Sequence, residues 1–359
     1  MTRVSLAAVR VGPVSFRWRR RSAIALGIAT VVALGLAVVS LGVGDYFVGF
    51  ARVVEVLLGG GNVTERLVVM NLRLPRTALA VLVGASLALS GAIVQTTARN
   101  SLASPDLLGV TSGAGAGAVA VIVIGGGASS AQPGNGPATL LNSIGTPTAA
   151  LVGGFAAAAL VAALLRFSGG GVLRPILIGI GVSAFFGGLT SWMLVEASID
   201  DAAKANAWLT GSLGGRGWDE VVTVGVTLLL MCIVLFPLSA RLPTIELGPS
   251  LARSLGVHVP RVTTGLLAVA VVLAAIASSA VGPISFVALV APHLARLACA
   301  TPRPPLAASA VIGAALVLAS DVVARVAFAP LLLPTGAVTA LVGAPFLIWL
   351  LVRSRKDAA

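Results

Sequence analysis

Long uncharged stretches restrict this sequence to very few folds. No charged residue stands between Asp106 and Arg166, and none between Arg261 and Arg296. A helix needs about 20 apolar residues to cross the hydrocarbon core of a bilayer. Only 10% of the residues are charged, against about a quarter in an average soluble domain. The sequence therefore excludes a soluble globular enzyme and a disordered chain, and it predicts a polytopic membrane protein.

Charges, prolines and turn-forming residues divide these stretches into separate helices. Segment 125–147 is rich in glycine and other turn formers, and proline interrupts segment 281–283. The ten expected spans lie near 23–43, 77–97, 107–124, 148–165, 175–195, 220–239, 262–281, 285–299, 306–326 and 336–352. The expected fold class is an all-α polytopic membrane protein.

The expected helices form a single transmembrane domain, residues 22–352. A basic segment, 1–21, precedes it and a short tail, 353–359, follows it. An even number of spans places both termini on one side. Most Lys and Arg residues fall on that side, so the positive-inside rule makes both termini cytoplasmic. The longest internal cytoplasmic loop is then 240–261.

The residues show no pattern typical of catalysis, metal binding or nucleic-acid binding. Neither lysine, Lys204 or Lys356, follows a glycine, so no phosphate-binding GxxxxGK[ST] loop is present. HExxH, GxSxG and CxxC are also missing, and the charges that make up the net +12 are scattered. We expect no catalytic residue, no metal, no cofactor and no nucleic-acid partner. Asp321 is the one carboxylate deep in an apolar run, and its spacing from Arg325 favours an ion pair over a proton relay.

Three longer motifs carry a resemblance to a known family. They cover residues 72–117, with SPDLLGV near the end, 282–296, which reads GPISFVALVAPHLAR, and 320–351. They resemble the permease family of bacterial ABC importers for iron-siderophore complexes, haem and vitamin B12. Within it, the ferric-enterobactin permease subunits are the most similar. The resemblance extends over about 64–352, nearly the whole chain.

The resemblance implies a type II ABC importer permease fold in the bacterial inner membrane. The implied partners are a second permease subunit, two ATPase subunits, an extracytoplasmic binding protein, a ferric siderophore and membrane lipid. A heterodimer of permeases is favoured, and a homodimer stays open. Import of vitamin B12 or haem is the alternative substrate class. An ion-coupled secondary transporter is less favoured, because such proteins usually carry several intramembrane acids.

The resemblance also assigns roles to individual residues on the outer side. Arg73, Arg76 and Arg325 lie at outer helix ends, against the positive-inside trend. Matching arginines in the vitamin B12 permease meet glutamates of the binding protein, and guanidinium groups suit carboxylates. Snorkelling to lipid headgroups is the alternative.

On the cytoplasmic side the resemblance implies a coupling helix and a gate. The coupling residues, which would contact the ATPase, are Glu246, Gly248, Ala252, Leu255, Gly256 and Val257. The sequence departs from its relatives at Pro249 and Ser250, where acidic residues are frequent. The gate residues are Asn100, Ser101 and Leu102, and a second gate element is expected around 168–171.

Small-residue runs surround the polar residues that are candidates for the pathway wall. These candidates are Ser86, Ser90, Gln95, Thr111 and Ser112. Runs of Gly and Ala also allow helices to approach closely, and this packing interpretation is the favoured one.

Overall fold

The computed structural model describes residues 7–11, 14–18, 20–44, 46–125, 145–167, 174–246, 248–327 and 332–356. The expected second gate element, 168–171, lies outside the described residues.

Helices make up almost all of the described chain. Those long and apolar enough to cross a membrane number seven: α1 (Arg20–Gly42), the continuous helix Val63–Ala98, α7 (Thr146–Phe167), α8 (Arg174–Glu196), α10 (Trp218–Ser239), α13 (Val259–Val281) and α15 (Leu306–Val326). Shorter apolar helices are α5 (Val110–Ile124), α14 (Val287–Cys299) and α16 (Thr335–Lys356). Together they match the ten expected spans, so the all-α membrane fold is confirmed. The exception is an antiparallel hairpin, β1 (Ala7–Val11) and β2 (Val14–Trp18), which the sequence did not predict.

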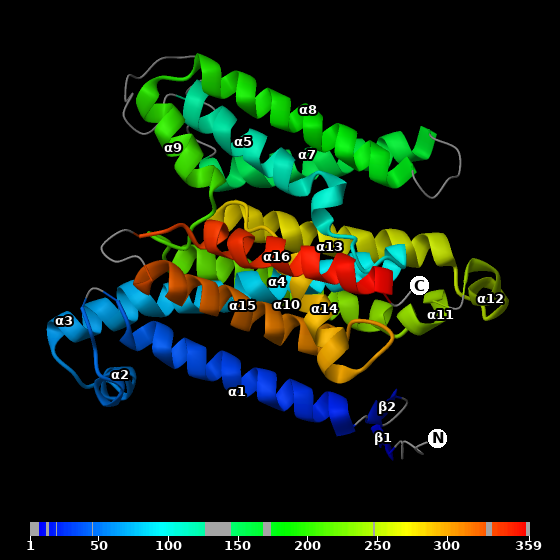
Figure 1. Cartoon of the computed structure of the whole chain (residues 1–359), viewed down its shortest axis with the longest axis horizontal. Coiled ribbons are helices and arrows are strands. Elements are labelled where there is room, and N and C mark those ends of the chain that lie inside the picture. Colours follow the sequence, from blue (N-terminus) through cyan, green and yellow to red (C-terminus); the bar gives the residue numbers. More distant parts are fainter. Residues whose placement is uncertain are drawn as a thin grey trace.

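Figure 1 shows the helices in two layers. One layer contains α5, α7 and α8, which pack against one another. The other contains α1, α10, α13, α14, α15 and α16 around α4 (Leu74–Ala98). Helix α4 contacts α10, α13, α14 and α15, and α13 also packs on α7 to connect the layers. Helix α4 is therefore the central element of the larger layer.

Short helices collect at the two ends of the bundle (Figure 1). Helices α2 (Phe50–Leu57), α3 (Val63–Arg66) and α9 (Ile199–Leu209) lie at one end, which we call the α2–α9 end. Helices α11 (Leu242–Glu246) and α12 (Pro249–Ser254) lie at the other, the α11–α12 end, together with the N-terminal hairpin and the last turn of α16.

The second span is longer than the sequence predicts. We expected it to begin near residue 77, but the helix runs unbroken from α3 through a π-helical segment, η1 (Leu67–Arg73), into α4. Pro75 cannot donate a backbone hydrogen bond to the preceding turn, which normally breaks an α-helix. The wider turns of η1 lie directly before this proline, and π-helical segments of this kind interrupt helices without ending them.

Glycines allow the helices of the larger layer to touch through their backbones. A Cβ atom on Gly84 would overlap the backbone of Gly313 on α15, and one on Gly91 would overlap the carbonyl of Ala288 on α14. In the other layer Gly113 and Gly153 meet in the same way. The packing interpretation of the small-residue runs is thus confirmed.

Gly91→Ala should destabilise the protein, because the added methyl group must displace the α14 backbone. Overpacking of this kind costs about 1–3 kcal/mol. Gly181→Ala on α8 is the matched control, since open space surrounds Gly181 and alanine favours helix. Melting of the purified chain in detergent should show a lower midpoint for Gly91→Ala only. Equal midpoints would contradict the close backbone contact.

Candidate functional site

A buried ionic cluster lies where α4, α15 and α16 meet. Asp321 on α15 is 0% exposed. Arg76 on α4 donates to its Oδ1 atom from Nη2 at 2.8 Å and from Nε at 3.0 Å. Arg325 Nη2 lies 3.1 Å from Oδ2, and Thr335 Oγ1 donates to Oδ1 at 3.2 Å. We call these four residues the Asp321 cluster. The predicted pair of Asp321 and Arg325 is confirmed, and Arg76 is an additional partner.

Arg325 also fastens α1 to the cluster. Its Nη1 atom donates to the carbonyl oxygens of Ser40 at 3.2 Å and Val43 at 3.0 Å. Its Nη2 atom donates to Ser40 Oγ at 2.7 Å, and Ser40 Oγ lies 2.9 Å from Thr77 Oγ1 on α4. One carboxylate and two guanidinium groups therefore connect four helices at the same level of the bundle.

Arg73, next to the cluster, also connects α1 to the rest of the bundle. Its side chain is buried and donates to the carbonyl oxygens of Leu41 at 2.9 Å, Gly42 at 3.0 Å and Tyr46. It thus holds the C-terminal end of α1 and the following loop against η1. These carbonyl oxygens include those that a helix end leaves without an intrahelical partner.

The three arginines expected at a docking surface differ in their accessibility. Arg73 and Arg325 are largely buried, and their guanidinium groups bind oxygen atoms of this chain. Arg76 keeps 19% of its side chain exposed. Arg73 and Arg325 are drawn inward because the apolar bundle contains carbonyl and carboxylate oxygens that need hydrogen-bond donors. Snorkelling does not describe Arg73 or Arg325 either, because both point into protein.

Exposed charges at the α2–α9 end come from the short helices instead. Arg52 on α2 lies 2.8 Å from Glu55 and 3.8 Å from Glu65, and the hydrogen bond that it donates to Glu55 raises the pKa of Arg52. On α9, hydrogen bonds from Ser198 and Lys204 lower the pKa of Asp201. Arg66 on α3 is also exposed. Arg52 and Arg66 oppose the positive-inside trend as Arg73 does, but no feature of the sequence separates exposed from buried arginines.

The expected coupling segment forms the helix α12 at the α11–α12 end. Gly248 precedes it with φ +109° and Gly256 follows it with φ +77°, backbone conformations that favour glycine. Glu246 is the last residue of α11. Ala252 is buried and its carbonyl accepts from the Val257 amide at 3.0 Å, which closes the end of α12.

The outward surface of this segment is apolar. Leu251 is 55% exposed and Leu255 is 64% exposed. Leu251 belongs to α12 and Leu255 directly follows its last residue, and both lie outside the long spans. Exposed apolar residues at the end of a membrane bundle favour a protein contact there.

The expected gate residues form the turn after α4. Arg99 ends α4 in a left-handed conformation, and Asn100 Oδ1 accepts a hydrogen bond from the Leu102 amide at 2.9 Å. Asn100 and Ser101 line a cavity of about 290 Å³, whereas Leu102 is not among its lining residues.

The pathway candidates divide into two groups. Ser90 donates to the carbonyl of Ala270 at 2.6 Å, Gln95 donates to the carbonyl of Leu289 at 3.1 Å, and Ser86 is fully buried. Ser86 and Ser90 lie between packed helices and do not line the 290 Å³ cavity, whereas Gln95 does line it, next to Asn100 and Ser101. Thr111 and Ser112 at the start of α5 are half-buried, and Thr111 donates to Asp106.

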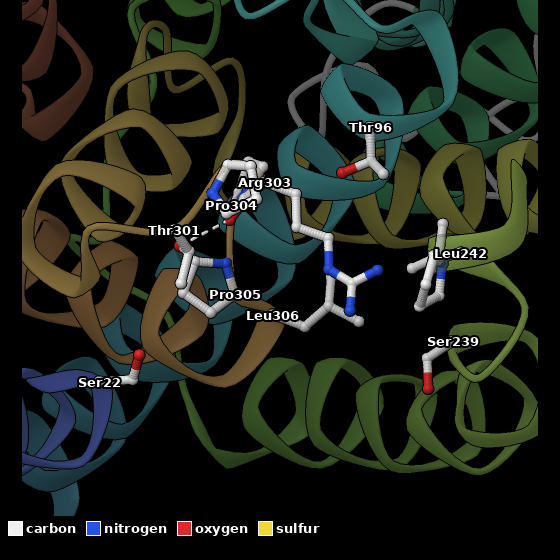
Figure 2. A pocket seen from close by; sticks show the side chains of 11 residues that line it. Ser22, Thr96, Ser239, Leu242, Thr301, Arg303, Pro304, Pro305 and Leu306 are labelled. Atoms are coloured by element: carbon white, nitrogen blue, oxygen red, sulfur yellow. Dashed lines mark hydrogen bonds between the residues drawn. The ribbon is translucent and has the colours of Figure 1, made fainter. Parts of the chain in front are cut away.

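A larger cavity of about 550 Å³ opens among helix ends at the α11–α12 end, and the sequence did not predict it. Figure 2 shows the Arg303 side chain pointing into it, among Thr96, Leu242 and Leu306. Among the described residues, no group of three or more His, Cys, Asp or Glu side chains is placed to hold a metal ion.

The whole architecture has close counterparts among known proteins. The profile of the FecCD transport family matches residues 31–353. The chain belongs to the FecCD transport family. It is therefore a multi-pass membrane permease of the bacterial ABC-importer type, a transport subunit rather than an enzyme, and family membership implies ATPase and binding-protein partners.

Individual relatives agree over most of their length. The ferric enterobactin transport system permease protein FepG of Escherichia coli is 39% identical over 85% of this chain and 89% of its own. The achromobactin transport system permease protein CbrC of Dickeya dadantii is 38% identical over 92% and 91%. A solved metal-chelate type ABC transporter in an inward-facing conformation superposes with a TM-score of 0.77 at 30% identity, over 91% of this chain and 98% of that one.

Asp321→Asn should strongly destabilise this permease, because it removes the carboxylate charge that Arg76 and Arg325 share. Breaking a buried pair in this way costs about 3–5 kcal/mol. Asp219→Asn, in the exposed first turn of α10, is the control and should cost about 0.3–1 kcal/mol. Thermal melting of the two purified variants checks the difference. A midpoint for Asp321→Asn that matches Asp219→Asn would show that the cluster contributes little.

Proposed function

We propose that this FecCD-family chain is the permease subunit through which an ABC importer carries ferric siderophores into the cytoplasm. The observation that carries the proposal is the agreement, over most of the chain, with permeases named for ferric enterobactin and achromobactin transport. The similarity to an iron(3+)-hydroxamate permease of Bacillus subtilis, 33% identical, supports the same substrate class.

Haem import is the second candidate. The hemin transport permease HmuU of Yersinia pestis is 33% identical over 82% of this chain, below the values for FepG and CbrC. Import of vitamin B12, another substrate class of the family that the sequence resembles, is a third candidate. Proton-coupled transport is disfavoured, because both oxygens of Asp321 contact guanidinium groups, so this intramembrane acid has a structural ion-pair role.

The importer is proposed to contain a second permease subunit, two ATPase subunits and one binding protein. A second permease of different sequence is favoured over a second copy of this chain. The α11–α12 end is assigned to the cytoplasm and the α2–α9 end to the outside of the inner membrane. The binding protein then docks near α2, α3 and α9, where Arg66 and part of Arg76 are accessible. Uptake of radioiron-labelled siderophore by proteoliposomes that contain the full complex tests the function. Equal uptake without ATP would refute it.

The coupling role of α12 makes a direct prediction. Leu255→Asp should place a charge in the proposed apolar contact and reduce ATPase binding at least about tenfold, since burying an unpaired charge costs several kcal/mol. Leu58→Asp, on another exposed leucine at the α2–α9 end, is the control and should retain the ATPase. Co-purification of the ATPase measures both. Unchanged co-purification of Leu255→Asp would contradict a coupling role for α12.

The proposed orientation is tested by cysteine labelling. With Cys232 and Cys299 replaced by serine, a cysteine at Ala203 on α9 should react with a membrane-impermeant maleimide added to spheroplasts. A cysteine at Ser250 on α12 should react only after the membrane is opened. Both positions are exposed in the structure, so accessibility of the side chain itself does not limit the reaction. Labelling of Ser250→Cys from outside would reverse the assignment.

A further inference from the structure

The 550 Å³ cavity lies at the level where four helices begin or end. Ser22 is near the start of α1, Thr96 near the end of α4, Ser239 is the last residue of α10, and Leu306 is the first of α15. Helices that cross a membrane end at the boundary between hydrocarbon and headgroups. The cavity is therefore at headgroup depth, whichever side of the membrane this end faces.

The cavity contains a positively charged side chain that is held by a proline-rich loop. The loop between α14 and α15 contains Pro302, Pro304 and Pro305, and all three line the cavity. Proline fixes its own φ angle and restricts the residue before it. Arg303 stands between these prolines and points into the cavity (Figure 2). Its position is thus fixed by the loop, and little backbone entropy is lost when a ligand binds.

Two more arginines lie directly beside Arg303. The 290 Å³ cavity shares Thr96 and Arg303 with the larger one, and Arg99 and Arg296 complete its basic wall. Arg99 donates to the carbonyl of Ile245 at 2.6 Å, and Arg296 lies 3.2 Å from His293 Nδ1. A guanidinium has several N–H donors, so both groups keep donors for a ligand. None of the described residues that line either cavity is acidic.

The larger cavity is flanked by two helices, α1 and α10, that have little protein around them. Only 11% of the apolar window of α1 and 17% of that of α10 is buried. Ile28 on α1 and Phe236 on α10 are exposed close to the cavity level. A lipid with its headgroup in the cavity therefore has apolar helix surface beside it for its acyl chains.

We propose that the cavity around Arg303 binds the phosphate headgroup of an anionic phospholipid such as phosphatidylglycerol. Three arginines without a lining carboxylate favour an anion, and arginine matches phosphate oxygens with paired hydrogen bonds. The headgroup depth and the exposed faces of α1 and α10 favour a lipid over a soluble anion. Basic pockets between transmembrane helices commonly bind such headgroups.

Native mass spectrometry of the full chain with its co-purifying subunits tests this site. The protein is titrated with phosphatidylglycerol or with zwitterionic phosphatidylethanolamine in detergent. Arg303→Gln should weaken phosphatidylglycerol binding about fivefold, the effect of one basic residue at a membrane surface. Arg303→Lys should retain part of the affinity. Arg241→Gln removes the same charge from an exposed position at the same end, outside both cavities, and should bind as wild type does.

Melting curves provide the second measurement. Phosphatidylglycerol should raise the melting midpoint of wild type and of Arg241→Gln, but raise that of Arg303→Gln less. Equal phosphatidylglycerol binding by wild type and Arg303→Gln would overturn the proposal. So would a shift of the same size from inorganic phosphate alone, which would assign the cavity to a soluble anion. Loss of the ATPase from Arg303→Gln with unchanged lipid binding would assign it to the ATPase instead.

Discussion

The charge of Asp321 is the interaction on which the arrangement of the bundle depends. A carboxylate that is fully buried among apolar helices is tolerable only when cations and donors surround it. Arg76, Arg325 and Thr335 supply these contacts from three different positions in the chain. Because Arg325 also reaches Ser40 on α1, the compensation of one charge fixes the relative positions of α1, α4, α15 and α16. Apolar packing alone has no comparable directionality.

Other contacts between helices depend on glycine, because a residue without a side chain lets two helix backbones approach closely. In a lipid environment apolar side chains gain little by leaving the lipid, so close backbone contact provides much of the association between helices. Gly84 with Gly313, and Gly91 with Ala288, place α4 directly against α15 and α14. The bundle therefore combines the Asp321 cluster near the α2–α9 end with close backbone crossings along its length.

The sequence predicted the helices well because charge, proline and glycine mark where membrane spans end. It also predicted the pair of Asp321 and Arg325, since residues four apart share a helix face. It could not predict that Arg76 binds the same carboxylate, because the two residues are 245 positions apart. For the same reason it did not predict that Arg73 and Arg325 are largely buried and bind carbonyl oxygens at the end of α1. The cavity around Arg303 was missed because its lining comes from the ends of helices that are distant in sequence.

The long helix that contains α4 has a mechanical consequence. Residues Val63–Ala98 form 36 consecutive helical residues, about 54 Å at the usual rise, whereas the hydrocarbon core is about 30 Å thick. This rod starts at the α2–α9 end of the bundle and ends beside Arg99, which lines the 290 Å³ cavity at the opposite end. A force on its α2–α9 end would be transmitted along the rod as tilt or rotation. The π-helical turns of η1 lie near the tip, so bending concentrates there, while the stretch between Arg76 and Arg99 moves as one piece.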